Sequence, residues 1–333
     1  MSRLTAAVAA LILATASGCG TAEAGGVPAG GPATPTAAPA TAPDPAFLLG
    51  DAGVHDPTLV KKPEGGYLLA HTGKNLQLRT STDRSTFTEA GAVFPGGAPW
   101  TTEYTKGGAD LWAPDLSYRD GKYWLYYSAS TFGSNHSAIF LATSATGASG
   151  SWENRGLVVE SGEGDDFNAI DPNLYVDGAG TWRLTFGSFW TGIKQIELDP
   201  ATGLRRGDTM ARLATRGDTA IEAPCLVEHG GYYYLWVSFD ACCKGAASTY
   251  RTMVGRATTP DGPFADRNGT PMTAGGGTEI LAGHGSVHGP GHPAVLADTD
   301  GEYLVYHYYA DSGSPHLGIN PIGYDAAGWP FVH

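Results

Sequence analysis

The chain has few charged residues and, beyond its N-terminus, no hydrophobic run long enough to cross a membrane. Charged residues make up 16% of its 333 residues, and 20 Lys and Arg stand against 33 Asp and Glu. The net charge of −13 and the lack of clustered Lys and Arg argue against nucleic acid as a partner, because phosphate binding requires such clusters. The acidic balance also disfavours polyanionic sugars, so a neutral partner fits best.

Cysteine is scarce as well, with four residues in the whole chain. Their spacing matches no zinc-binding pattern. Thiols of an exported protein can oxidise, and the adjacent Cys242 and Cys243 either close a small ring that stiffens a loop or remain buried thiols without a role. The sequence leaves both interpretations open.

The N-terminus differs from the rest of the chain. Arg3 precedes an apolar run over residues 4–14, and small residues then lead to Cys19, which is typical of a lipoprotein-type signal peptide over residues 1–19. Ordinary signal cleavage without a lipid is the alternative. Residues 20–46 are rich in Ala, Pro and Gly and predict a disordered linker. We therefore expect a secreted, monomeric protein that touches a membrane only through a lipid on Cys19, with its folded domain at 47–333.

Helix signals are nearly absent from the folded part, whereas strand signals are dense. Five segments rich in aromatic and branched residues each follow a glycine, which is the pattern of strands after tight turns. They cover residues 67–70, 123–127, 182–186, 232–237 and 303–307.

A second repeat precedes these strands. Five times, at intervals of roughly 50 to 70 residues, a proline stands beside Asp, Glu or His. A unit of this length with four strands is one blade of a β-propeller. The predicted fold is therefore all-β, a five-bladed β-propeller, with a two-domain β-sandwich as the alternative. The five motifs are His55-Asp56-Pro57, Ala113-Pro114-Asp115, Ile170-Asp171-Pro172, Glu222-Ala223-Pro224 and Gly291-His292-Pro293.

The position of these prolines predicts where their polar neighbours lie. Proline is tolerated at the beginning of a strand, and the innermost strand of each blade lines the central channel, so the polar side chains converge at one end of that channel. Asp56, Asp171 and Glu222 cannot all ionise cheaply in one cleft, which separates their pKa values. Glycoside hydrolysis needs one protonated and one ionised carboxyl group. The alternative is that each acid only accepts backbone N–H bonds at a strand turn.

The sequences of these motifs resemble those of glycoside hydrolase family 43. The resemblance is strongest to the endo-acting arabinanases, which cut α-1,5-L-arabinan, the neutral side chain of pectin. The resemblance runs from about residue 50 to residue 330 and keeps the order of the motifs. It rests on residues 54–57, 112–115, 169–172, 221–224 and 289–292, with further likeness at 187–193, 239–245 and 248–251.

The resemblance implies roles for the three acids. Asp56 resembles the general base that activates water, Glu222 the general acid, and Asp171 the residue that raises the pKa of the acid and orients it. The family inverts the anomeric centre, so the carboxyl groups of Asp56 and Glu222 are expected about 6.5–9.5 Å apart, which leaves room for a water molecule.

The resemblance also implies binding residues. Trp112 and Phe132 resemble aromatic platforms that stack on sugar rings, and His55 and Asn168 are candidate donors to the substrate. His292 resembles an axial histidine facing calcium whose shell is completed by water, although calcium prefers oxygen ligands. The alternative for His292 is a hydrogen bond to a carboxylate.

Other residues of the motifs depart from the pattern. Asp115 follows its proline instead of preceding it, so we interpret it as structural. His284 and His288 lie in a Gly-rich loop where arabinanases often carry Asn or other small polar residues, which leaves the role of that loop open.

The predicted function is thus inverting endo-hydrolysis of α-1,5-L-arabinan. Within the same family the alternatives are an exo-acting α-L-arabinofuranosidase or a β-xylosidase. The even spacing of the repeats indicates short loops and an open groove, which favours endo action. Outside catalysis, the alternative is a sugar-binding propeller that has lost an axial carboxylate, and none is lost here.

Overall fold

The structure is a computed structural model that describes residues 41–217 and 219–333. The predictions of a signal peptide over 1–19, of lipidation at Cys19 and of most of the linker lie outside these residues. Within the described ranges no helix has both the length and the apolarity to cross a membrane. In the part of the chain that the structure describes, helix is confined to one short turn, α1 (Thr102–Thr105), and three 3₁₀ turns at Pro99–Thr101, Gly245–Ala247 and Met272–Ala274.

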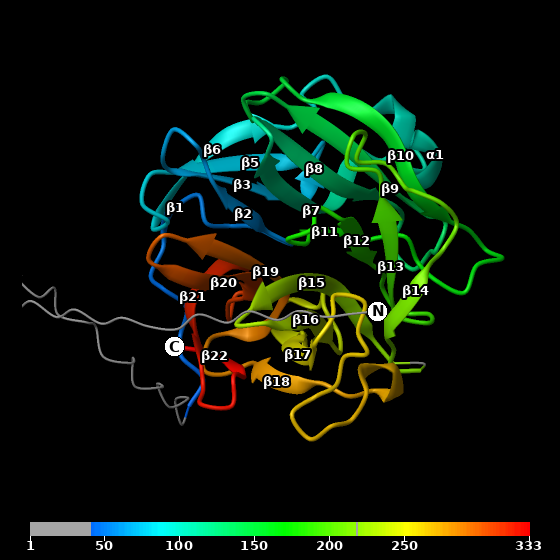
Figure 1. The fold of residues 1–333 in the computed structure, drawn as a ribbon. Coiled ribbons are helices and arrows are strands. Elements are labelled where there is room, and N and C mark those ends of the chain that lie inside the picture. The colour runs from blue at the N-terminus through cyan, green and yellow to red at the C-terminus, as the bar shows by residue number, and fades with distance from the viewer. Residues whose placement is uncertain (1–40, 218) are drawn as a thin grey trace, which may run out of the picture. The chain divides into compact units, whose positions relative to one another are not determined.

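The described residues form five sheets in chain order, each built on a meander of four antiparallel strands, with the two-residue β1 added in parallel to the first sheet and β4 added to the second (Figure 1). The first contains β1 (Leu49–Gly50), β2 (Thr58–Lys61), β3 (Tyr67–His71), β5 (Gln77–Ser81) and β6 (Thr86–Ala92). The second contains β4 (Gly73–Lys74), β7 (Asp110–Arg119), β8 (Lys122–Ala129), β9 (Ser137–Ser144) and β10 (Glu153–Ser161). The third contains β11 (Asn173–Val176), β12 (Trp182–Phe186), β13 (Ile193–Leu198) and β14 (Ala211–Ala214). The fourth contains β15 (Ile221–His229), β16 (Tyr232–Phe239), β17 (Arg251–Ala257) and β18 (Thr278–Leu281). The fifth contains β19 (His288–Asp298), β20 (Gly301–Tyr309), β21 (Pro315–Tyr324) and β22 (Pro330–Val332).

The first long strand of each sheet lies on the inside of a closed ring. β2 contacts β7, β7 contacts β11, β11 contacts β15, β15 contacts β19, and β19 returns to β2. The five sheets are therefore the blades of a five-bladed β-propeller, as the repeat predicts, and the two-domain sandwich is wrong. The five predicted aromatic strands are the second strands of the blades, β3, β8, β12, β16 and β20.

The hydrophobic core is divided into five clusters, each lying between two neighbouring blades. Alternate residues of a strand face opposite sides of its sheet, so the second strands supply two clusters at once. In β8, Leu125 packs toward the first blade and Trp124 toward the third, where it meets Trp182 edge-on at a centroid distance of 4.8 Å. Most Tyr and Trp residues thus pack between blades, as expected from the sequence.

The residue before each motif proline has a left-handed backbone. The φ angles are 51° at Asp56, 47° at Ala113, 59° at Asp171, 54° at Ala223 and 56° at His292. A non-glycine residue in this region costs about 1–3 kcal/mol and persists only where its surroundings fix it. Here a side chain of the preceding blade accepts each backbone N–H. The acceptors are His307, Thr72, Ser128, Asp171 and Ser238, in the order of the five residues above.

This shared position shows which motif residues are equivalent. Asp56, Asp171 and His292 occupy it in three blades, and Ala113 and Ala223 occupy it in the other two. Glu222 therefore stands one residue earlier than the other polar residues of the motifs.

The segment before the first blade joins it to the last blade. Ala46 donates its N–H to Ile319 of β21 at 3.0 Å, and Leu317 of β21 donates to Ala52 at 2.8 Å. Asn320 donates to the carbonyl of Asp44 at 3.0 Å, and β1 pairs in parallel with β6. Asp44 and Ala46, which the sequence assigns to the linker, thus contact the propeller and help to close its ring.

Candidate active site

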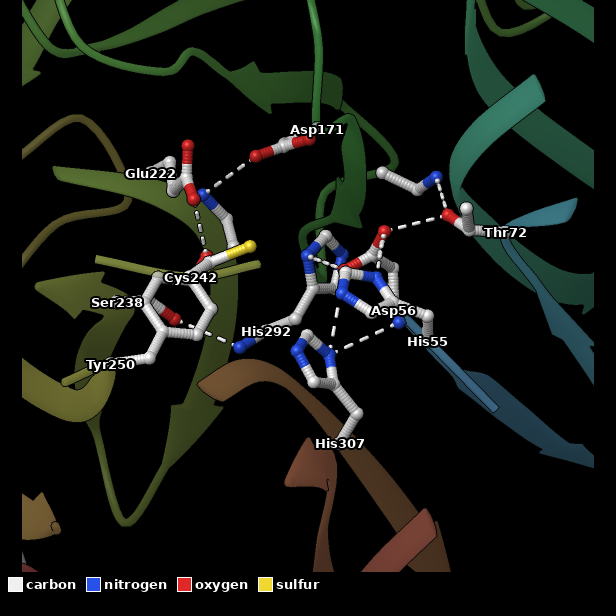
Figure 2. Close-up of polar contacts among 12 residues, drawn as sticks. His55, Asp56, Thr72, Asp171, Glu222, Ser238, Cys242, Tyr250, His292 and His307 are labelled. Carbon is white, nitrogen blue, oxygen red and sulfur yellow. Dashed lines mark hydrogen bonds and ion pairs between the residues drawn. The ribbon is translucent and has the colours of Figure 1, made fainter. Parts of the chain in front are cut away.

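All eight residues singled out by the sequence line one cavity of about 1100 Å³ at the mouth of the ring. They come from different blades, and Figure 2 shows four of them, Asp56, Asp171, Glu222 and His292, turned toward a common centre. The ring of inner strands therefore brings together residues that are far apart in the sequence. The full set is His55, Asp56, Trp112, Phe132, Asn168, Asp171, Glu222 and His292.

Asp56 is surrounded by hydrogen-bond donors and imidazoles. Its Oδ2 accepts from Thr72 Oγ1 at 2.6 Å and lies 2.9 Å from His55 Nδ1, and its Oδ1 lies 3.1 Å from His292 Nδ1. Burial by itself would raise the pKa of Asp56, but His55 and His292 outweigh it and hold the pKa well below its usual value. Asp56 is therefore ionised at neutral pH.

The pKa of Glu222 shifts in the opposite direction, above its usual value. Its carboxyl accepts from Ser188 Oγ at 2.6 Å and Tyr250 Oη at 2.8 Å. Burial raises the pKa of Glu222, these two hydrogen bonds act against that rise, and the charge of Asp56 adds to it. The cavity thus contains one carboxyl group that ionises easily and one that retains its proton to higher pH.

Asp171 is the most deeply buried of the three acids, with a residue exposure of 6%. Its Oδ2 accepts the N–H of Ala223, the residue after Glu222, at 3.1 Å. Burial raises the pKa of Asp171 well above its usual value; His292 lowers it and Glu222 raises it further. Because two interacting acids affect each other's ionisation, Asp171 and Glu222 titrate as a pair.

His292 pairs with a carboxylate in this structure. Burial disfavours its charged form, but Asp56 raises the pKa of His292 to about 9. Among the described residues the groups of three close metal-ligating atoms are His55 with Cys242 and Cys243, and His55 with Asp56 and His307, and neither includes His292. In this structure His292 forms an ion pair with Asp56.

His307, which the sequence analysis did not identify, supports Asp56 from the fifth blade. It is fully buried, its Nδ1 accepts the N–H of Asp56 at 3.1 Å, and its ring stacks on that of His55 at a centroid distance of 3.9 Å (Figure 2). Burial lowers the pKa of His307 well below its usual value. A neutral imidazole therefore holds the backbone of Asp56.

Aromatic side chains border the acids. Phe132 is 84% exposed and Trp112 is half-buried, and both line the cavity as predicted. Phe189 and Trp190 line it too, with exposures of 44% and 39%. Both have left-handed backbones, with φ of 52° and 41°. The sequence analysis noted their motif at 187–193 but gave it no role.

The adjacent cysteines lie on the wall of the same cavity. Cys242 and Cys243 form a disulfide, and Cys243 is exposed. The interpretation as buried thiols is therefore wrong for this pair, although Cys225 is a buried free thiol.

The remaining predicted residues have simpler environments. Asn168 is 3% exposed, and its buried Oδ1 has no hydrogen-bond partner. Asp115 accepts from Leu174 N–H at 2.8 Å and from Asn173 at 3.1 Å, so it links the second and third blades, in line with a structural role. His284 lies near the carbonyl of Ala282, and His288 pairs with Asp311 at 2.8 Å, and neither histidine lines the cavity.

The sequence also did not reveal that Thr72, Ser188 and Tyr250 donate hydrogen bonds to the acids. Thr72 and Ser188 each follow the second strand of a blade, and Tyr250 precedes the third strand of its blade. Thr72 and Tyr250 contact an acid of their own blade, whereas Ser188 contacts Glu222 of the next blade. Nothing in the local sequence marks such a contact, although the likeness at 187–193 and 248–251 includes Ser188 and Tyr250.

Comparisons with known proteins place these features in a family context. The sequence model for glycosyl hydrolases family 43 matches residues 50–330. The extracellular endo-α-(1→5)-L-arabinanase 1 of Bacillus subtilis is 42% identical over 286 residues, which is 83% of this chain and 87% of that protein.

Three solved structures have the same fold. A GH43 endo-arabinanase of Bacillus licheniformis is 42% identical with a TM-score of 0.80, covering 86% of this chain and 99% of that one. An exo-1,5-α-L-arabinanase from a bovine ruminal metagenomic library is 39% identical with a TM-score of 0.80, covering 85% and 98%. An α-L-arabinanase of Cellvibrio cellulosa complexed with arabinohexaose is 33% identical with a TM-score of 0.81, covering 84% and 95%.

Proposed function

The chain belongs to glycosyl hydrolases family 43, and on that basis we propose that it hydrolyses α-1,5-L-arabinofuranosidic linkages inside arabinan chains, with inversion at the anomeric carbon. The observation that carries this proposal is the pair of opposite pKa shifts, lowered at Asp56 and raised at Glu222, within one cavity. Inverting hydrolysis requires such a division between an ionised and a protonated carboxyl group.

Asp56 is the general base in this mechanism. Thr72 and His55 face its Oδ2 and His292 faces its Oδ1, so the carboxylate is fixed and remains ionised. It takes a proton from a water molecule, and the resulting nucleophile attacks the anomeric carbon from the face opposite the leaving group.

Glu222 is the general acid. It gives its proton to the glycosidic oxygen as the bond to the anomeric carbon breaks, so the leaving sugar departs as a neutral alcohol. Ser188 and Tyr250 orient the carboxyl group, and Asp171 fixes the backbone beside it through the N–H of Ala223. After one turnover Asp56 carries a proton and Glu222 has lost one, and exchange with water restores both.

Sugar rings have apolar faces and polar rims, which suits a cavity with aromatic walls and a few polar groups. Trp112 and Phe132 are the proposed platforms, and Asn168 is the proposed donor to substrate hydroxyls. The ring nitrogens of His55 lie 2.9 Å from Asp56 Oδ2 and 2.7 Å from Tyr309 Oη, so His55 supports the base instead of donating to the substrate. The unpartnered buried Oδ1 of Asn168 can also accept from a substrate hydroxyl, and a buried polar atom without a partner is rare in proteins. The net charge of −13 agrees with a neutral polysaccharide as substrate.

The test is hydrolysis of linear, debranched arabinan by the wild type and by Glu222→Ala. A spread of oligosaccharides early in the reaction, lost in the variant, supports endo action by this acid. Equal turnover by both proteins would eliminate Glu222 as the acid, and no turnover by either would favour a sugar-binding propeller.

An exo-acting arabinanase is the second candidate, because a protein described as such is 39% identical to this chain and shares its fold. Free arabinose or a single short product from the start of the reaction would establish exo action.

We also propose that the protein is secreted, that a lipid anchors it and that it binds a structural ion. We expect secretion, since a 42% identical relative is described as extracellular, and attachment by a lipid on Cys19. Loss of the membrane-bound fraction in Cys19→Ser tests the anchor. We also propose a structural calcium ion, which the family resemblance implies, and we assign it no step of the reaction. An unchanged melting curve in the presence of a chelator would show that no such ion stabilises the fold.

A further inference from the structure

A chain of contacts leads from the Cys242–Cys243 disulfide to the proposed base through Tyr309, to which the mechanism assigns no role, and through His55. The backbone N–H of Cys243 donates to the Tyr309 hydroxyl at 3.1 Å. That hydroxyl lies 2.7 Å from His55 Nε2, and His55 Nδ1 lies 2.9 Å from Asp56 Oδ2. Cys243 belongs to the fourth blade, Tyr309 to the fifth and His55 to the first, so three blades meet in this chain.

We propose that Tyr309, fixed by the Cys242–Cys243 disulfide loop, is a positioning residue for the reaction that holds His55 in the tautomer whose Nδ1–H faces Asp56. The proposal rests on the proposed function, because it gives His55 a task at the proposed base.

The hydrogen-bond directions assign this tautomer. The Tyr309 oxygen accepts from Cys243 N–H, so its own proton is free to be donated to His55 Nε2. An Nε2 atom that accepts leaves the proton of a neutral imidazole on Nδ1. The other tautomer would leave Nδ1 without a proton 2.9 Å from a carboxylate oxygen, which is repulsive. The contacts at Nε2 and at Nδ1 therefore favour the same tautomer of His55.

The surroundings of His55 leave its ring little freedom. It stacks on the buried His307 at a centroid distance of 3.9 Å (Figure 2), and Cys243 Sγ lies 3.8 Å from its Nε2. Tyr309 is itself only 4% exposed. His307 and Tyr309 are alternate residues of β20, so they project to the same side of the fifth blade, one toward the backbone of Asp56 and the other toward His55.

The disulfide contributes by fixing the donor. Cys243 has a left-handed backbone with φ of 66°, and the bond to Cys242 restricts the freedom of both residues. The N–H that fixes the direction of the Tyr309 hydroxyl is thereby held in place. We expect the loop to affect turnover through Tyr309 and His55, without touching the reacting atoms.

Tyr309→Phe tests the proposal, because it keeps the ring and removes the hydroxyl. We expect kcat on linear arabinan to fall by at least about tenfold with KM nearly unchanged, the size of effect seen when the partner that orients a functional histidine is lost. Tyr308→Phe is the matched control, since Tyr308 is the next residue of β20 and does not line the cavity. Cys242→Ser/Cys243→Ser should lower kcat in the same direction and by less.

The imidazole nitrogen shifts of His55, assigned by comparison with His55→Gln, give a readout independent of turnover. The wild type should show a protonated Nδ1 and an accepting Nε2, and Tyr309→Phe should shift the Nε2 resonance, because that nitrogen loses the hydrogen bond from the Tyr309 hydroxyl. Unchanged shifts in Tyr309→Phe would overturn the proposal, and so would a kcat equal to that of Tyr308→Phe. A wild type without activity on arabinan would instead overturn the proposed function, and the nitrogen shifts would still decide the tautomer.

Discussion

Each of the three buried carboxyl groups has a distinct environment. Asp56 has two imidazoles and a threonine hydroxyl, Glu222 has two neutral hydroxyls, and Asp171 has a backbone N–H. Cationic and polar partners favour the ionised form, whereas burial favours the neutral one. The proposed division into base and acid follows from these partners.

Removing either ionisable group should abolish most of the turnover. We expect Asp56→Asn and Glu222→Gln each to lower kcat by at least about 10²–10⁴-fold, the usual contribution of a general acid or base. Both substitutions keep the shape of the side chain, so the melting temperature should remain near that of the wild type. A variant that unfolds would instead support a strand-capping role for that acid.

The pKa shifts also predict the pH dependence of turnover. Since the pKa of Asp56 is lowered, the base stays ionised in mildly acidic solution and activity should persist there. Since the pKa of Glu222 is raised, the acid keeps its proton above the usual range of a carboxyl, and activity should fall as rising pH removes that proton. A profile of kcat/KM against pH checks this. Because the charge of Asp56 raises the pKa of Glu222, the residual activity of Asp56→Ala should decline at a lower pH than that of the wild type. A decline at the same pH in both proteins would contradict this coupling.

The sequence reveals the acids and two partners of Asp56, His55 and His292, but not the other partners. The acids adjoin prolines in a repeat, which is a pattern visible in one dimension. Ser188 and Tyr250 reach Glu222 from other strands, and His307 reaches Asp56 across the closure of the ring. Those contacts exist only after the blades have assembled, so no local pattern predicts them.

At the scale of single elements, the turn from β12 to β13 is the least expected part of the site. It places Phe189 and Trp190 in succession with left-handed backbones. Phe189 N–H donates to the carbonyl of Ile221 at 2.9 Å, which ties the turn to the inner strand that carries Glu222. A strained conformation held by its surroundings is typical of a functional site.

Trp190→Ala tests this turn. We expect a several-fold higher KM for long arabinan and a smaller effect on short oligosaccharides, because an exposed aromatic face in the cavity supplies stacking area to a sugar. Tyr232→Ala is the matched control, since Tyr232 is 38% exposed, close to the 39% of Trp190, and lies outside the cavity. Equal KM values for the two variants would show that the turn does not bind substrate.

At the scale of the whole molecule, the described strands of each blade follow one another along the chain, except that β4 lies between β3 and β5 of the first blade and pairs with β7 of the second. The ring is closed by the segment that includes β1, which bonds to β21 on one side and pairs with β6 on the other. The repeat in the sequence predicts the number of blades because each repeat is one meander. It does not predict the closure, because the closing segment lies outside the repeat.

The closure can be tested with two truncated chains. A chain that begins at residue 54 should melt at a clearly lower temperature than one that begins at residue 41, since it lacks β1 and the hydrogen bonds of Ala46 and Ala52 to β21. Activity should decline with it, because the fifth and first blades hold His307 and Asp56 together. Equal melting temperatures would mean that packing between these two blades is sufficient for closure.

Proton NMR of the first products from linear α-1,5-arabinan tests whether Asp56 directs water to the face of the sugar opposite the bond that Glu222 protonates. We expect the newly formed reducing ends to appear first as the β-anomer and only later to equilibrate. First-formed α-anomers would show retention of configuration and would contradict the assigned roles of both residues.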